Sequence, residues 1–245
     1  MEKILERVVD KVAQQAKQTQ KKDEQTKQFS KILPALLEKG IDNIDFSMFT
    51  ESMKTALLNS IGTEYMRKGR MREAMKAFIL AGNKESLTAM GDDYTRVCLY
   101  SNAIECYRLA NNTNKLAKIG TKCLEEGRAG DAITAFRAIN DTAKLVAVGE
   151  DCLRREKYDH AIEVFSAVGN KEKLAQVGDK ALRERQLGYA AKAYELAGDS
   201  QRLSTLGDAC LREGLFATAH KAYTLAGNTM MAQFVQQNFG NQLNL

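Results

Sequence analysis

The chain repeats itself every twenty-nine positions over most of its length, as from Gly62 to Gly91, and this repeat limits the possible fold more than any other feature. Each copy keeps a leucine, a glycine, an alanine and an aromatic residue at fixed positions. The leucines are Leu58, Leu87, Leu116, Leu145, Leu174 and Leu203; the glycines are Gly62, Gly91, Gly120, Gly149, Gly178 and Gly207. The alanines are Ala74, Ala103, Ala132, Ala161, Ala190 and Ala219; the aromatics are Phe78, Tyr107, Phe136, Phe165, Tyr194 and Tyr223. Six copies without an insertion or deletion indicate a stack of similar units.

Within one copy the apolar residues have helical spacing. The first run consists of Leu174, Val177, Gly178, Ala181 and Leu182, which is the i, i+3, i+4, i+7, i+8 pattern of a buried helix face. A second run follows after a short turn and consists of Ala190, Ala193, Tyr194 and Ala197. Each copy therefore predicts a helix–turn–helix unit.

Glycines and short polar residues mark the ends of these helices. Three units have a glycine in the turn between their helices, at Gly69, Gly127 and Gly214, where a left-handed residue would end the first helix. The junction between units carries Gly198 or Gly227 as the end of the second helix. The residue after the junction predicts the N-cap of the next first helix, and it is Asn83, Asn112, Asp141, Asn170, Asp199 and Asn228 in turn.

The recurring glycine inside the first helix requires an explanation, because glycine in a helix interior costs about 1 kcal/mol relative to alanine. We expect close packing of the two helices of a unit to offset this cost. The small recurring alanine of the second helix is the expected partner of the glycine in this contact.

The pattern of small and aromatic residues resembles the tetratricopeptide repeat. The stretch IGTEYMRKGRMREAMKAFILA, at residues 61–81, matches it most fully, through Gly62, Tyr65, Ala74, Phe78 and Ala81. The resemblance covers residues 58–228, with units shorter than the usual length of about 34 residues. The proline that usually follows the second helix is absent. Such short units are also similar to helical-repeat stretches of vesicle-coat and intraflagellar-transport proteins. The resemblance implies an all-α, right-handed α-solenoid with first helices on its concave face.

The sequence predicts four parts along the chain. Residues 1–28 form an amphipathic helix and a polar tether, and the helix either docks on the repeats or binds elsewhere, as a short coiled coil or a partner-binding helix. Residues 29–53 are a degenerate capping unit, with Phe29, Ile32, Leu36, Gly40 and Phe49 in the repeat's positions and Leu33 in place of the glycine. Residues 54–228 hold six repeats similar to tetratricopeptide repeats. Residues 229–245 form a capping helix and a short tail.

Composition and motifs give no support to an enzyme. The net charge of +5 is thinly spread, so nucleic acid is an unlikely partner, and there is no apolar run long enough to span a membrane. No nucleotide-binding or zinc-protease motif is present, the five cysteines form no metal-like pair, and His160 and His220 favour packing roles. We therefore expect a cytoplasmic protein without a cofactor, a metal or catalytic residues.

One set of charged residues has a second interpretation besides packing. An arginine recurs near the end of the first helices, at Arg67, Arg96, Arg154, Arg183 and Arg212, with Glu125 as the exception. An acid stands four residues earlier at Asp92, Glu150, Asp179 and Asp208. The spacing predicts i,i+4 ion pairs on a solvated helix. The alternative is a partner-binding groove in which the arginines clamp carboxylates of a bound peptide.

The sequence therefore predicts a non-enzymatic scaffold that binds a peptide or helix of another protein along the concave surface. The alternative from another class is an assembly subunit that self-associates through its ends or its N-terminal helix. An RNA-binding solenoid is a minor alternative.

Overall fold

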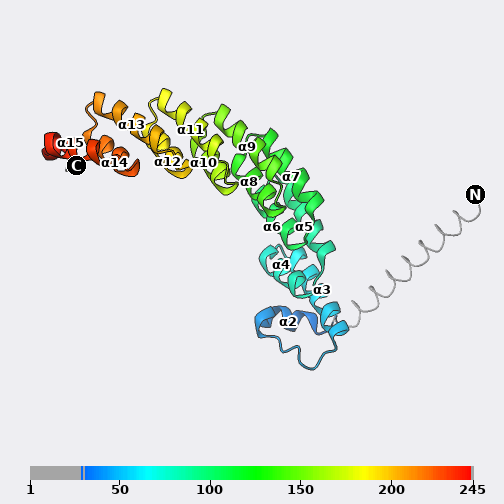
Figure 1. Ribbon diagram of the computed structural model, residues 1–245. Helices are drawn as coiled ribbons and strands as arrows, with labels where there is room; N and C mark the ends of the chain where they lie inside the picture. The colour runs from blue at the N-terminus through cyan, green and yellow to red at the C-terminus, as the bar shows by residue number, and fades with distance from the viewer. Residues whose placement is uncertain (1–28, 30, 244–245) are drawn as a thin grey trace, which may run out of the picture. The chain divides into compact units, whose positions relative to one another are not determined.

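The computed structural model describes residue 29 and residues 31–243, and in this range it is all-α without a strand. The helices pack against their neighbours in the chain as a helical solenoid, which confirms the predicted fold class (Figure 1). The predicted N-terminal helix and tether at residues 1–28 and the last two residues of the tail lie outside the described residues.

First and second helices alternate along the chain. The first helices are α3 (Glu51–Arg67), α5 (Lys84–Arg96), α7 (Thr113–Glu125), α9 (Thr142–Arg154), α11 (Lys171–Arg183) and α13 (Ser200–Arg212). The second helices are α4 (Met71–Leu80), α6 (Tyr100–Leu109), α8 (Ala129–Ala138), α10 (Tyr158–Ala167), α12 (Leu187–Ala197) and α14 (Phe216–Leu225).

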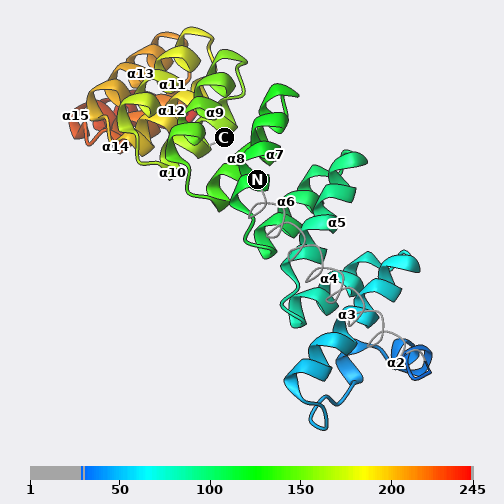
Figure 2. The ribbon, with the colours of Figure 1, turned by 90° about the vertical axis from the view of Figure 1, so that its right-hand side faces the viewer.

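The chain divides into two compact units between Lys115 and Leu116. In the second of them, α9, α11 and α13 form one layer and α10, α12 and α14 form the other (Figures 1 and 2). In this unit α10, α12 and α14 each pack against their own first helix and against the first-type helix that follows, which for α14 is α15 (Thr229–Phe239).

The predicted caps are present at every junction between repeats. The six capping side chains accept a hydrogen bond from the backbone N–H three residues ahead, at Asn83, Asn112, Asp141, Asn170, Asp199 and Asn228. Gly69, Gly127 and Gly214 have φ values of 72°, 72° and 74°, so the predicted left-handed turn residues are confirmed.

The turn between the two helices of a unit needs a positive φ even where the residue is not glycine. The same position is held by Cys98, Glu156 and Arg185 in the other three units, with φ of 59°, 59° and 58°. A residue with a Cβ is strained in this conformation by about 1–2 kcal/mol. Packing of the two flanking helices therefore imposes the turn geometry on these three residues.

We expect Arg185→Gly to raise the free energy of unfolding by about 0.5–1 kcal/mol. Glycine relieves the backbone strain at positive φ, and this gain is partly offset because glycine loses more conformational entropy on folding. The ion pair that is lost, between Arg185 and Glu213 at 3.9 Å, is highly exposed on the arginine side and contributes little. Gln186→Gly is the control, because Gln186 has a φ of −85° and glycine there should lower stability. Urea titration of the three proteins measures both effects.

The glycine inside each first helix lies against an aromatic ring. The prediction that the recurring alanine of the second helix is its contact partner is therefore wrong. A Cβ added at any of the six repeat glycines would come within 3.0 Å of the recurring ring on the second helix of its own unit, from Phe78 at Gly62 to Tyr223 at Gly207. The six recurring alanines are completely buried and leave room for the helices to approach. The glycine is therefore required by the ring.

The segment expected to be a degenerate unit contains one α-helix, α2 (Leu33–Lys39), and a 3₁₀ turn at Ile41–Asn43. No second helix forms over residues 44–50. Asp45 stands in the position of the completely buried alanine, and its carboxylate accepts a hydrogen bond from Ser47 N at 2.8 Å instead. A carboxylate cannot be buried there without a partner, which explains the missing helix. Helix α2 packs on α3 through Leu33 and Leu37.

At the other end, α15 (Thr229–Phe239) occupies the position of a further first helix and packs on α14. Its bounds agree with the helix predicted for residues 229–239. Val235 is buried, and the Phe239 ring stacks on Phe216 with 4.0 Å between centroids. Gln236 stands where the other first helices carry the packing glycine.

Candidate interaction surface

The first helices carry cavities at equivalent positions of the repeat, two in each of the compact units. Cavities of about 930 and 570 Å³ lie along α3 and α5, and cavities of about 550 and 510 Å³ lie along α7 and α11. Two adjacent positions of the first helix line all four of them, as Asn59 and Ser60, Thr88 and Ala89, Ala117 and Lys118, and Ala175 and Gln176. We call the exposed face of the first helices that contains these cavities the first-helix surface.

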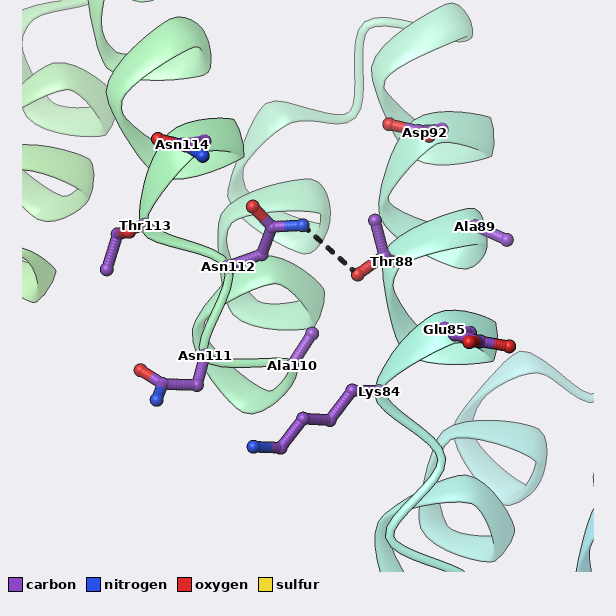
Figure 3. Close-up of a pocket in the computed structure, with 10 residues that line it drawn as sticks. All are labelled: Lys84, Glu85, Thr88, Ala89, Asp92, Ala110, Asn111, Asn112, Thr113 and Asn114. Carbon is purple, nitrogen blue, oxygen red and sulfur yellow. Dashed lines mark hydrogen bonds between the residues drawn. The ribbon is translucent and has the colours of Figure 1, made fainter. Parts of the chain in front are cut away.

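Figure 3 shows the cavity along α5, which is lined by that helix and by the junction that follows α6. The Asn112 side chain donates from Nδ2 to Thr88 Oγ1 at 3.5 Å, while its Oδ1 caps α7 at Lys115 N. In the preceding unit, Asn83 Nδ2 donates to Asn59 Oδ1 at 2.7 Å. Capping residues therefore form the wall of the cavity and are held in place by the first helix beside them.

The acids of the predicted site are held by residues far along the chain rather than by the arginines four residues later. Asp92 accepts from Tyr107 Oη at 2.7 Å and from Lys115 Nζ at 2.6 Å. Asp179 accepts in the same way from Tyr194 Oη at 2.9 Å and Arg202 Nε at 3.0 Å.

The other two acids keep one half of this arrangement. Glu150 pairs with Lys173 at 2.7 Å, and Asp208 accepts from Tyr223 Oη at 2.7 Å. We define the aspartate link as the hydrogen bond from a tyrosine at the recurring aromatic position to the aspartate of the same repeat. The link also includes the basic residue of the next repeat where that residue bonds to the aspartate. Where the tyrosine, the aspartate and the basic residue are all present, the link joins both helices of one repeat to the first helix of the next repeat.

The identity of the acid depends on the recurring aromatic residue of the same unit. Aspartate stands at this position only where that aromatic is Tyr107, Tyr194 or Tyr223. Where the aromatic is phenylalanine, the position holds Thr63, Thr121 or Glu150. A phenolic O–H requires an acceptor when its ring is buried, whereas a phenylalanine ring does not. This pairing explains the pattern.

The bond between Tyr107 and Asp92 changes the acidity of both partners. Burial raises the pKa of Asp92, but the hydrogen bonds from Lys115 and Tyr107 outweigh it and hold the pKa below its ordinary value. Burial, with the bond to Asp92, raises the pKa of Tyr107 to about 12. The pKa values of Tyr194 and Tyr223 are raised by the same two causes. The three tyrosines are therefore neutral donors near neutral pH, and Asp92 is an anion.

The predicted i,i+4 ion pairs are wrong. The guanidinium groups of Arg67, Arg96 and Arg154 pair with the acids three residues earlier, Glu64, Asp93 and Asp151, at 2.5–2.9 Å. Arg212 Nε donates to the backbone carbonyl of Asp208 at 3.2 Å. All five arginines, Arg183 included, are exposed at the last residue of their helices, where a cation interacts favourably with the helix dipole. The arginines thus lie at the edge of the first-helix surface.

The basic residues that pair with these acids were not predicted from the sequence, although they recur with the period of the repeat. A basic residue recurs at Lys115, Lys144, Lys173 and Arg202. Lys144 has no acid opposite, since the equivalent position is Thr121, and its Nζ lies 5.3 Å from the centroid of the Phe136 ring. The relevant spacing is that from an acid to the basic residue of the next unit, whereas the i,i+4 rule considers one helix only.

The four buried cysteine side chains are not activated nucleophiles, because burial raises the pKa of each thiol. Cys106, Cys123, Cys152 and Cys210 are buried, and burial raises the pKa of Cys106 and of Cys123 to about 11. Cys98 is exposed and accepts a hydrogen bond from Tyr100 Oη at 3.5 Å. Among residues 29 and 31–243, no three His, Cys, Asp or Glu side chains are grouped so that they could hold a metal ion.

Within the described part of the chain, every helix is too short or too polar to cross a bilayer. In comparisons with known proteins, no family model matches the chain and no curated protein has a matching sequence. The likeness to tetratricopeptide repeats therefore remains an interpretation of the sequence pattern, whereas the helical repeat itself is a property of the structure.

Proposed function

We propose that the protein is a non-enzymatic scaffold whose first-helix surface binds a peptide or helix segment of another protein. The observation that carries this proposal is the recurrence of cavities of 510–930 Å³ at the same positions of several units. Within one compact unit, equivalent depressions on different first helices suit an elongated ligand that crosses from one first helix to another. A small-molecule enzyme would instead concentrate its functional groups in one site.

The chemistry of the surface suits peptide recognition. Its cavities present hydroxyl and amide groups, such as those of Thr88 and Asn112, which can bond to a peptide backbone. The exposed arginines at the helix ends, including Arg154 and Arg183, can clamp ligand carboxylates from the edge of the surface. Asp92 and Asp179, which have both a tyrosine and a cation as partners, stabilise the array and are not ligand contacts in this proposal.

Filling two of the cavities should weaken binding. Peptides selected from a random short-peptide library on the full chain are expected to bind Ala89→Arg and Gln176→Arg at least about tenfold more weakly, because an interface pocket that is blocked loses its main anchor. Both residues are exposed and line cavities. Affinities are measured by biolayer interferometry and helicity by circular dichroism.

The matched controls place the same side chain on second helices. Thr134→Arg and Ser166→Arg alter exposed positions of α8 and α10 and should bind the selected peptides as the unaltered chain does. Hydrogen exchange should slow in the first helices when peptide is bound. Protection confined to the second helices, or a library without any binder, would contradict the proposal.

A further inference from the structure

The repeat pattern changes at the C-terminal end of the first-helix surface. Asp208 accepts a hydrogen bond from Tyr223, as its equivalents do from their tyrosines, but the position of the cation is held by Met231. Lys115, Lys173 and Arg202 fill this position for Asp92, Glu150 and Asp179. In the described residues no ion pair is recorded for the Asp208 carboxylate, and Asp208 is exposed where the three equivalent acids are half-buried.

The same end of the surface becomes apolar. Met230 and Phe234, on α15, are 75% and 45% exposed. Both occupy repeat positions that line cavities in other repeats. Met230 is equivalent to Glu85 on α5 and Glu172 on α11, and Phe234 is equivalent to Ala89 and Gln176 on the same two helices. The surface thus changes from polar or small side chains to two large apolar ones, which we call, with Asp208, the terminal patch.

The apolar part of the terminal patch is held in place by neighbouring rings. The Phe234 ring lies edge-on to Phe239, with 6.3 Å between centroids, and Phe239 stacks on Phe216 at 4.0 Å. An exposed ring that is fixed by its neighbours loses little conformational freedom on binding, which favours its use as an anchor.

The charges nearby select the kind of partner. Helix α15 carries no charged side chain, so it offers uncharged groups, such as the amides of Gln233 and Gln237, around Met230 and Phe234. Arg212 is the nearest cation along α13, but its Nε is bound to the backbone carbonyl of Asp208 rather than to the carboxylate. Asp92 and Asn114, the repeat equivalents of Asp208 and Met230, line the same cavity, so the repeat places the Asp208 carboxylate beside the apolar residues of α15. An anion beside an uncharged apolar surface is complementary to a cation beside an apolar side chain.

We propose that the terminal patch binds a peptide segment that carries a lysine or arginine next to a large apolar residue. The basic group takes the place that Lys115, Lys173 and Arg202 fill inside the array and bonds to the Asp208 carboxylate. The apolar side chain packs on Met230 and Phe234. The proposal rests on the proposed function, because it names the chemistry of the partner at one end of the same surface.

The test compares the sequences that the random short-peptide library yields on different variants of the full chain. Binders of the unaltered chain should be enriched in a basic residue within about one helical turn of Leu, Met, Ile or Phe. Asp208→Asn should reduce the enrichment in basic residues at least about fivefold, and Phe234→Gln should do the same for the apolar residue. Both positions are exposed, and circular dichroism checks that both variants fold.

Asp179→Asn is the matched control, since it alters the same position of the repeat but its cation, Arg202, is already in place. The sequences it selects should be those of the unaltered chain. Binders that ignore Asp208→Asn and Phe234→Gln but are lost in Ala89→Arg and Gln176→Arg would overturn this inference and leave the proposed function standing. The inference is also overturned if the library yields no peptide and the unaltered chain forms a dimer that Phe234→Gln dissociates. The terminal patch would then bind a second copy of this chain.

Discussion

Leucine in place of Gly178 is expected to lower the free energy of unfolding by about 3 kcal/mol or more, as overpacking of a filled core does. A Cβ at this position would lie 2.5 Å from Cδ1 of Tyr194. The ring cannot swing away, because it is buried and its hydroxyl is bonded to Asp179 at 2.9 Å. For a chain of this size the loss corresponds to a melting temperature lower by about 6–12 °C.

Alanine gives the sharper form of this test, because two effects of opposite sign compete. Alanine is favoured over glycine by about 1 kcal/mol in a helix interior. At Gly178 we expect the clash with the ring to exceed that gain, so Gly178→Ala is also less stable than the unaltered chain. Gly188→Ala is the control in α12, where an added Cβ meets nothing within 4 Å, and it should keep or raise the melting temperature. Equal melting temperatures for Gly178→Ala and Gly188→Ala would show that the ring does not require the glycine.

The repeat period was sufficient to predict the helices and their caps because these depend on local chemistry. An N-cap side chain such as Asn170 bonds to a backbone N–H three residues ahead, and a left-handed glycine such as Gly214 acts on its own φ. Both signals are complete within a few residues of sequence. The capping residue recurs at all six junctions and the turn glycine in three of the six units, so several copies support the same prediction.

Contacts between helices were harder to predict, because their residues are distant in sequence. The packing glycine was assigned to an alanine, although its partner is the aromatic ring one helical turn beyond that alanine, as Tyr194 is for Gly178. Likewise Asp92 was assigned to Arg96 on its own helix, whereas it bonds to Tyr107 and Lys115 on two others. The coincidence of aspartate with tyrosine at these two positions was present in the sequence and would have revealed the bond.

The missing second helix at residues 44–50 shows a further limit. Phe49 matched the aromatic position, and the match of apolar residues predicted a degenerate unit. The decisive residue was Asp45, in the position where six alanines are completely buried. A single charge at a buried position cancels an otherwise favourable pattern, because burying it unpaired costs several kcal/mol.

Alkaline pH is expected to destabilise the array through the three tyrosines of the aspartate link. Burial, together with the bond to an aspartate, raises the pKa of Tyr107, Tyr194 and Tyr223 above their ordinary value of 10.0, and that of Tyr107 to about 12. A group whose pKa is raised by folding contributes stability that is fully present below its unfolded pKa. That stability is lost as the pH rises through the folded pKa. The relevant window therefore begins near pH 10 and extends beyond pH 12.

The size of the effect follows from proton linkage. At pH 11 the unfolded chain has released these three protons, while the folded chain retains them. Relative to pH 9, each tyrosine therefore lowers the free energy of unfolding by about 1.4 kcal/mol, and the three together lower it by about 4 kcal/mol. Urea titrations at pH 9 and pH 11 measure the difference. The same difference should be smaller by about 4 kcal/mol in a variant with Tyr107→Phe, Tyr194→Phe and Tyr223→Phe.

Phenylalanine is a suitable replacement because Phe78, Phe136 and Phe165 already fill the same position in the other units with their rings buried. The variant loses three hydrogen bonds at every pH, so only the change between pH 9 and pH 11 is diagnostic. Absorbance of tyrosinate in the near ultraviolet supplies an independent measure. The three tyrosines should ionise only as the chain unfolds, together with Tyr158, whose pKa is also raised by burial and by its bond to Glu184. Ionisation of all tyrosines near pH 10 in the folded chain would show that the aspartate link does not hold these protons.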